Sequence, residues 1–257
     1  MIQFSKEQIY IVTGASSGIG EAVAILLNKL GSTVIAIARN EERLKAMKEK
    51  CKYPENIHIE IKDLTEDIDG LPKYVKSLKE KYGKFSGMAY CAGISCLKPL
   101  LLLDYDELKR VFDINYFTPI MMTKGITDRR NNIGKGCSLV YLSSIDALAS
   151  AKGQPCYSGS KAALSASIKA IAKEVSSYGI RLNSILPSMI KTQMTCSLQG
   201  LITPENGDER YPFGWGNPDD VANLVMFLLS DKSKFISGQS YVVDSGGRKQ
   251  RITLYQI

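Results

Sequence analysis

Short apolar segments alternate with amphipathic segments along the chain, and this alternation sets the fold class. Seven apolar runs have the length and β-branched content of single buried strands: residues 9–12, 33–38, 57–61, 87–91, 138–142, 181–186 and 239–243. Between them lie segments with helical periodicity: residues 21–30, 41–51, 71–82, 105–123, 157–178 and 218–230. Strands that alternate with helices of this length predict an α/β fold with a doubly wound, parallel, seven-stranded sheet.

Glycine and proline residues mark where several of these elements end. Gly31 stands where the first helix needs its C′ residue, and Pro218 stands at the first turn of the last helix. Pro119 should kink or end the helix over 105–123, and Pro187 should stop the sixth strand. No linker divides the chain, so we expect one domain over residues 1–257. The long irregular stretch at 188–217 predicts a substrate lid.

Composition and charge exclude several classes of protein. The 257 residues are 44% hydrophobic and 23% charged, as in ordinary soluble domains. The N-terminus lacks a signal-peptide pattern, and apolar runs such as 100–103 are too short to span a membrane. Six scattered cysteines without a CxxC pair indicate reduced thiols in a cytoplasmic protein. Because His58 is the only histidine, we expect no metal site and no histidine-dependent triad.

The net charge of +7 raises the alternative of a nucleic-acid-binding protein. The basic runs, residues 128–130 and 248–251, are short and lack interleaved aromatic residues. The charge therefore favours a solvated basic surface, with attraction of an acidic substrate or carrier as the second interpretation. We expect neither a nucleic-acid nor a membrane partner.

A glycine-rich turn connects the first strand to the first helix. Glycines at this point permit a tight turn and the close approach of a pyrophosphate to the positive end of the helix. The spacing is G-x3-G-x-G and lacks the Gly-Lys-Ser/Thr of a Walker A loop. The turn therefore predicts a dinucleotide site that includes Gly14, Ser16, Ser17, Gly18, Ile19 and Gly20.

The residue after the second strand predicts which dinucleotide is bound. An acidic side chain there would accept a hydrogen bond from the ribose 2′-hydroxyl, whereas an arginine favours a 2′-phosphate. Arg39 occupies this position, with Arg43 one turn along the next helix. We therefore expect NADP(H) to be preferred and NAD(H) to be possible; the alternative is that Arg39 is a solvated surface charge. Asp63, after the third strand, either bonds the adenine edge or caps the next segment.

Three residues have the spacing of a hydride-transfer site. Ser144 follows the fifth strand, Tyr157 comes thirteen residues later, and Lys161 follows Tyr157 on the same helix face. A free tyrosine has a pKa of about 10, so a nearby cation is needed to make it an effective acid or base at neutral pH. Lys161 can supply that charge, while Ser144 can hydrogen-bond the substrate oxygen.

Together these segments resemble the short-chain dehydrogenase/reductase family over essentially the whole chain. The resemblance implies a Rossmann fold, a nicotinamide cofactor, a homodimer or homotetramer, and a catalytic tetrad of Asn115, Ser144, Tyr157 and Lys161. It implies that Asn115 holds a water in a proton relay and that Thr192 bonds the nicotinamide carboxamide. Further cofactor contacts carried over from the family are Leu64, Cys91, Ala92, Gly93, Tyr157, Lys161, Pro187 and Ile190.

The chain departs from the family pattern at two places. The usual Asn-Asn-Ala-Gly reads Tyr-Cys-Ala-Gly at 90–93, which removes an amide that braces the sheet. The usual Pro-Gly reads Pro187-Ser188, which changes the floor of the nicotinamide site. The C-terminal half looks most like bacterial 3-oxoacyl-acyl-carrier-protein reductases and their sugar- and alcohol-active relatives.

The sequence therefore predicts an NADPH-dependent oxidoreductase that reduces a small or carrier-bound carbonyl to a secondary alcohol, or catalyses the reverse. The alternative is a catalytically silent NADP(H)-binding sensor or regulator on the same fold. An intact tetrad argues against that alternative, because such a protein could lose its tyrosine or lysine without penalty.

Overall fold

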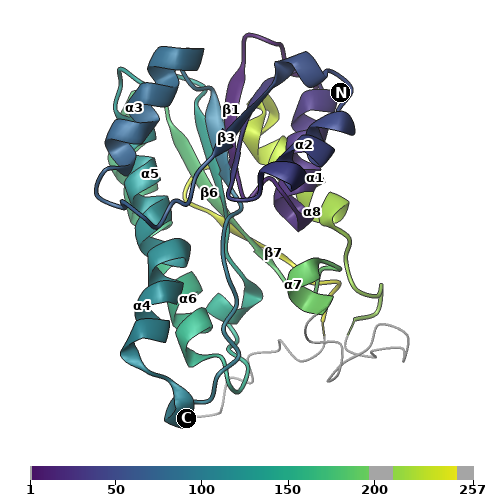
Figure 1. Cartoon of the computed structure of the whole chain (residues 1–257), viewed down its shortest axis with the longest axis vertical. Coiled ribbons are helices and arrows are strands. Elements are labelled where there is room, and N and C mark those ends of the chain that lie inside the picture. Colours follow the sequence, from purple (N-terminus) through teal and green to yellow (C-terminus); the bar gives the residue numbers. More distant parts are fainter. Residues whose placement is uncertain (1, 197–210, 248–257) are drawn as a thin grey trace.

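The strands form one twisted parallel sheet at the centre of the molecule (Figure 1). The computed structural model describes residues 2–196 and 211–247. Within them the sheet has seven strands in the order β3-β2-β1-β4-β5-β6-β7. Their bounds are β1 Ile9–Thr13, β2 Thr33–Ala38, β3 Ile57–Ile61, β4 Gly87–Tyr90, β5 Ser138–Leu142, β6 Arg181–Pro187 and β7 Ser240–Val243. This confirms the predicted fold class.

Helices cover both faces of the sheet (Figure 1). Their bounds are α1 Gly18–Lys29, α2 Glu41–Glu49, α3 Leu71–Tyr82, α4 Tyr105–Phe112, α5 Thr118–Thr127, α6 Pro155–Val175, α7 Gln193–Cys196 and α8 Pro218–Leu229. None of the helices in the described part of the chain is long and apolar enough to cross a membrane.

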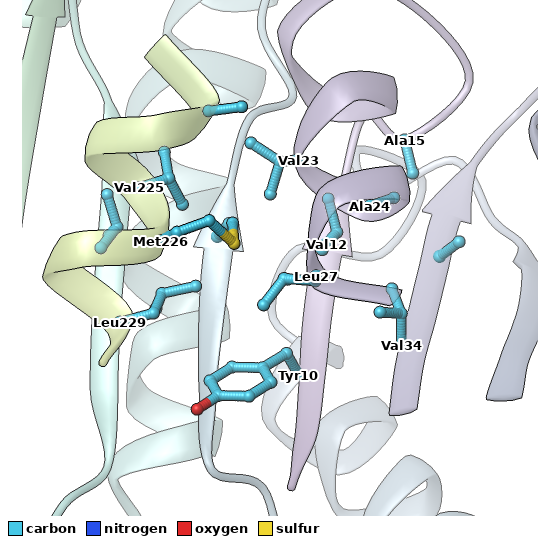
Figure 2. Packing of buried hydrophobic residues seen from close by; sticks show 14 of the residues in the cluster. Tyr10, Val12, Ala15, Val23, Ala24, Leu27, Val34, Val225, Met226 and Leu229 are labelled. Atoms are coloured by element: carbon cyan, nitrogen blue, oxygen red, sulfur yellow. The ribbon is translucent and has the colours of Figure 1, made fainter. Parts of the chain in front are cut away.

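Alternate strand residues supply two separate cores. On one face, Val23 and Leu27 of α1 meet Val225 and Met226 of α8 above Val12 of β1 (Figure 2). On the opposite face, α3, α5 and α6 pack against the other set of strand side chains, among them Ile11, Met88, Leu139 and Leu182. Because the central strands are buried on both faces, β1 and β4 are almost entirely apolar rather than alternating.

The strand order places a crevice at the carboxyl edge of the sheet. β1 pairs with β2 on one side and with β4 on the other, so the connections from β1 and β4 leave in opposite directions. In an open α/β sheet this reversal opens a crevice in which ligands bind. The turns after β1, β2 and β4 all border it.

The helix predicted over 105–123 is divided before Pro119. A π-helical turn, Asp113–Phe117, separates α4 from α5, and Pro119 lies in the first turn of α5. Proline has no backbone N–H, so it cannot donate the α-helical hydrogen bond to the carbonyl of Asn115. The helical path therefore changes its hydrogen bonding upstream of the proline and continues to Thr127.

Other element boundaries differ by a few residues from the sequence prediction. Pro187 is the last residue of β6 rather than its stop, and α6 begins at Pro155, whose missing N–H is tolerated in a first turn. Gly31 follows α1 with a φ of +107°, as expected for a glycine at this position. Residues 197–210 of the predicted lid and the basic run 248–251 lie outside the described residues; Ile190 of the lid pairs with Gly216.

Candidate active site

The glycine turn after β1 is held against the turn after β4 by backbone contacts. Gly14 has a φ of +65°, and a Cβ there would lie 2.9 Å from the backbone nitrogen of Ala92. A Cβ on Gly20 would clash with the carbonyl oxygen of Gly14. The Thr13 hydroxyl accepts hydrogen bonds of 3.1 Å from the backbone N–H groups of Cys91 and Ala92. This link ties β1 to β4 where the family's bracing amide is missing.

A cleft of about 840 Å³ opens over this turn. Several glycines of the turn line it, and at Gly18 (φ +56°) a Cβ would come within 3.2 Å of Thr192. Such a glycine-lined surface at a helix N-terminus fits the pyrophosphate of a dinucleotide. The predicted cofactor residues that line the cleft are Gly14, Ser16, Ser17, Gly18, Ile19, Gly20, Arg39, Asp63, Leu64, Cys91, Ala92, Gly93 and Thr192.

Charged side chains surround the end of the cleft beside β2 and β3. Arg39 forms a 3.4 Å ion pair with Asp63, and its own side chain is 74% exposed. Asp63 also accepts hydrogen bonds from the backbone and hydroxyl of Thr65, so the structure shows its capping interaction. Arg43 donates a 2.7 Å hydrogen bond to Gln193 of α7, and both residues line the cleft. Lys62, which the sequence reasoning did not single out, lines the same end.

The predicted catalytic side chains converge where β5 and α6 meet. Ser144 directly follows β5 and caps the short helical turn Ile145–Ala147. Tyr157 and Lys161 lie one turn apart on α6, with the Lys161 ammonium 5.9 Å from the centre of the Tyr157 ring. Lys161 Nζ donates a 2.8 Å hydrogen bond to the carbonyl of Leu142, the last residue of β5. Helix α6 and strand β5 thus fix the set together.

Gly93 lines the cleft and lies directly next to Asn115 and Lys161. A Cβ on Gly93 would lie 3.0 Å from Asn115 Oδ1 and 3.3 Å from Lys161 Nζ. The Asn115 amide is fully buried; it accepts from the backbone N–H of Ile94 and donates to the Ile94 carbonyl, each at 3.0 Å. It also donates to the hydroxyl of Ser160 on α6. The amide thus holds the turn after β4 against the helix that carries Lys161.

Burial is the largest influence on the pKa values of Tyr157 and Lys161, the two predicted proton-transfer groups. It raises the pKa of Tyr157 to about 12; a hydrogen bond with Ser144 acts in the opposite direction, and the nearby Asp146 carboxylate adds to the rise. Burial lowers the pKa of Lys161 to about 8. The pKa of the phenol is therefore raised, rather than lowered as the spacing of Tyr157 and Lys161 predicts, because desolvation is the largest effect.

The structure distributes the remaining predicted residues around the cleft. Four predicted cofactor residues are not among those that line the cleft: Tyr157, Lys161, Pro187 and Ile190. Pro187 is the last residue of β6, and Ile190 is a buried residue two positions before Thr192. Across residues 2–196 and 211–247, no group of three or more His, Cys, Asp or Glu side chains could hold a metal ion.

Asp146 is a site residue that the sequence reasoning missed. Ser144 Oγ donates a 3.0 Å hydrogen bond to Asp146 Oδ2, and the Asp146 backbone N–H donates back to Ser144 Oγ at 3.1 Å. The available signal was an acidic residue two positions after Ser144.

Comparison with known proteins settles the family. The family model described as Enoyl-(Acyl carrier protein) reductase matches residues 14–247. The 3-oxoacyl-acyl-carrier-protein reductase FabG of Rickettsia felis is 34% identical over 239 residues, which cover 92% of this chain and 95% of that protein. The chain belongs to the short-chain dehydrogenase/reductase family. It is therefore an NAD(P)-dependent oxidoreductase by family.

Other members of the short-chain dehydrogenase/reductase family show how widely this scaffold is used. D-erythrulose reductase of Gallus gallus is 29% identical, with 92% of this chain and 94% of that protein covered. A solved short-chain dehydrogenase/reductase of Brucella melitensis, described as a glucose/ribitol dehydrogenase, is 26% identical. It covers 96% of this chain and 98% of its own, with a TM-score of 0.88.

Proposed function

We propose that this protein is an NADPH-dependent reductase that converts a small or carrier-bound ketone to a secondary alcohol, or catalyses the reverse. The observation that carries the proposal is the convergence of Ser144, Tyr157 and Lys161 beside a glycine-lined cleft. Relatives named as 3-oxoacyl-acyl-carrier-protein and D-erythrulose reductases support carbonyl reduction. Arg39 and Arg43 at the β2 end of the cleft support a 2′-phosphate on the cofactor.

The glycine turn and the residues lining the cleft would hold the cofactor. When bound, NADPH supplies the hydride that adds to the carbonyl carbon of the substrate. As the carbonyl oxygen gains charge, Ser144 donates a hydrogen bond to it and Tyr157 gives it a proton. An alkoxide is more basic than a phenolate, so this transfer is favourable even from a phenol whose pKa is raised to about 12.

Lys161 would stabilise the phenolate that remains on Tyr157. Its ammonium lies close to the ring and is fully buried, so the charge acts through a medium of low polarity. Asn115 positions the turn after β4 and, by the family resemblance, holds the water through which Tyr157 regains its proton. The carbonyl of Asn115 receives no α-helical hydrogen bond from Pro119, which suits that role.

Among the described residues, no observation favours the sensor alternative. All four residues of the predicted tetrad are present in the sequence and lie near one another around the junction of β5 and α6. The cytoplasmic location and the homodimer or homotetramer stay predictions.

The proposal is tested by following the loss of NADPH absorbance against a panel of 3-oxoacyl thioesters, keto-sugars, hydroxyketones and simple diketones. We expect turnover with at least one class and weaker use of NADH. A protein that binds NADPH but reduces no member of the panel, and oxidises none of the corresponding alcohols, would contradict the proposed reductase.

A further inference from the structure

The carboxylate of Asp146 lies beside Ser144, and no ion pair with another described residue neutralises it. Asp146 is half-buried, which raises the pKa of its carboxyl, and hydrogen bonds from the Ser144 hydroxyl and the Ala151 backbone N–H stabilise its charge. Among the described residues, no lysine or arginine contributes to the environment of this carboxylate. Removing an unpaired carboxylate partly from water costs folding free energy. A role in substrate binding would account for this carboxylate.

The hydrogen bond between Ser144 and Asp146 conflicts with the binding of a plain ketone. The Ser144 hydroxyl has one proton, which it donates to Asp146 Oδ2 at 3.0 Å. To hydrogen-bond a substrate carbonyl, Ser144 must turn that proton away from the carboxylate. Asp146 then keeps the Ala151 N–H but loses a hydrogen bond to a charged oxygen, and a ketone with only alkyl groups offers no replacement.

A ketone that carries a hydroxyl group next to its carbonyl removes this penalty. If the carbon next to the carbonyl carries an O–H, its proton can reach Asp146 while the carbonyl oxygen takes the proton of Ser144. The two oxygens of such a substrate are close neighbours, as are Ser144 Oγ and Asp146 Oδ2. The exchange leaves every polar group satisfied, whereas an apolar acyl chain would bring methylene groups against a charged oxygen.

We propose that Asp146 is a specificity-determining residue that selects α-hydroxyketones by accepting a hydrogen bond from the hydroxyl next to the reacting carbonyl. This inference rests on the proposed reductase function and narrows its substrate class. It favours polar hydroxyketones over the 3-oxo group of an alkyl chain.

The test compares two ketones of the same size, 1-hydroxybutan-2-one and pentan-3-one, in which a methyl group replaces the hydroxyl. We expect the wild-type protein to reduce the hydroxyketone with a kcat/KM about 10-fold or more above that of the plain ketone, the range for a hydrogen bond to a charged group. Asp146→Val should abolish or invert this ratio. Asp146→Asn, which keeps the size and an acceptor oxygen, should give an intermediate ratio.

Ser150→Ala is the matched control. The Ser150 hydroxyl donates a 3.2 Å hydrogen bond to the backbone carbonyl of Asp146, so this variant loosens the same loop without changing the carboxylate. We expect it to keep the wild-type ratio. NADPH binding by each variant verifies that it is folded.

The outcomes separate the two proposals. A ratio that stays the same in both Asp146 variants, or that changes equally in Ser150→Ala, would overturn the selection of hydroxyketones while leaving the reductase intact. A wild-type protein that binds NADPH but reduces neither ketone, nor any other carbonyl of the panel, would overturn the reductase and the inference with it.

Discussion

The two ends of the site are built from different materials. At the cofactor end, Gly14, Gly18 and Gly20 form a surface of backbone atoms packed against Ala92 and Thr192. At the substrate end, side chains on the short turn after β5 carry the polar groups, and the Ser144 hydroxyl donates a hydrogen bond to the Asp146 carboxylate. A backbone surface tolerates almost no substitution, whereas a side-chain surface can change while the scaffold stays the same. This difference explains how one fold can keep its cofactor and vary its substrate.

Removing the charge of Lys161 should impair the predicted catalytic set between these two ends. In Lys161→Met we expect kcat to fall about 1000-fold, because the phenolate on Tyr157 loses its stabilising cation. The same variant should raise the free energy of unfolding. The pKa of Lys161 is about 8 in the folded protein and 10.5 in the reference state, so burying the charged form costs up to about 3 kcal/mol below pH 8.

Steady-state kinetics and thermal unfolding at pH 7 measure both effects. In the wild-type protein, the unfolded state binds more protons than the folded state between about pH 8 and pH 10.5. The unfavourable contribution of Lys161 to the free energy of unfolding therefore becomes smaller as pH rises through this window. A less stable Lys161→Met variant would contradict the assigned burial cost.

At the cofactor end, adding a single methyl group to the glycine turn should weaken NADPH binding. Gly20→Ala places a Cβ against the carbonyl oxygen of Gly14, so the turn must open. We expect the Kd for NADPH to rise at least about 100-fold, as for other strained backbone changes of a few kcal/mol. Gly159→Ala is the control, because its Cβ would meet only a Phe112 ring atom at 3.8 Å. Equal NADPH affinity of Gly20→Ala and wild type, by titration calorimetry, would contradict the packed turn.

The pH dependence of reduction separates the charge of Lys161 from the protonation of Tyr157. Lys161 loses its proton at about pH 8, well below the value of about 12 for Tyr157. We therefore expect kcat/KM for reduction to be level at low pH and to fall about 10-fold per unit above pH 8. Lys161→Arg should retain some activity and move this fall to higher pH. A decline at the same pH in both proteins would assign it to another group.

The smallest effect is expected at the exposed rim of the cofactor end. In Arg39→Ala, the preference for NADPH over NADH should fall about 10-fold, because one contact to the 2′-phosphate is lost while Arg43 remains. Lys45→Ala removes the same charge from α2 outside the cleft and serves as the control. If the two variants change the ratio of the cofactor affinities equally, general surface charge rather than Arg39 sets the preference.

The sequence predicted the backbone-made parts of the molecule better than the side-chain contacts. Buried parallel strands are continuously apolar and glycine turns have fixed spacing, so the sheet and the glycine turn could be recognised from one-dimensional patterns. The sequence placed the break in the helix over 105–123 at Pro119, but the structure places it earlier, at Asp113–Phe117. The reason is that the missing N–H of a proline affects the carbonyl four positions earlier. The capping of the Thr65 backbone N–H by the Asp63 carboxylate was one of two alternatives left open by the sequence, and only three-dimensional contacts could show it; the adenine contact stays a prediction.

Asp146 shows most clearly where sequence reasoning ends. Its position two residues after Ser144 is visible in the sequence, but the role proposed for it depends on a hydrogen bond and on the lack of a cationic partner among the described residues. Likewise, the pKa of Tyr157 depends on how much water the fold removes, and helical spacing alone contains no information about that.

The most direct test of the account is Tyr157→Phe, assayed for turnover and for NADPH binding in the same preparation. The substitution removes only the hydroxyl, so the ring packing beside Lys161 is kept. The account predicts a Kd for NADPH within about twofold of wild type and a kcat lowered at least about 1000-fold. A variant that retains a substantial part of the wild-type kcat would show that another group supplies the proton and would contradict the assigned role of Tyr157.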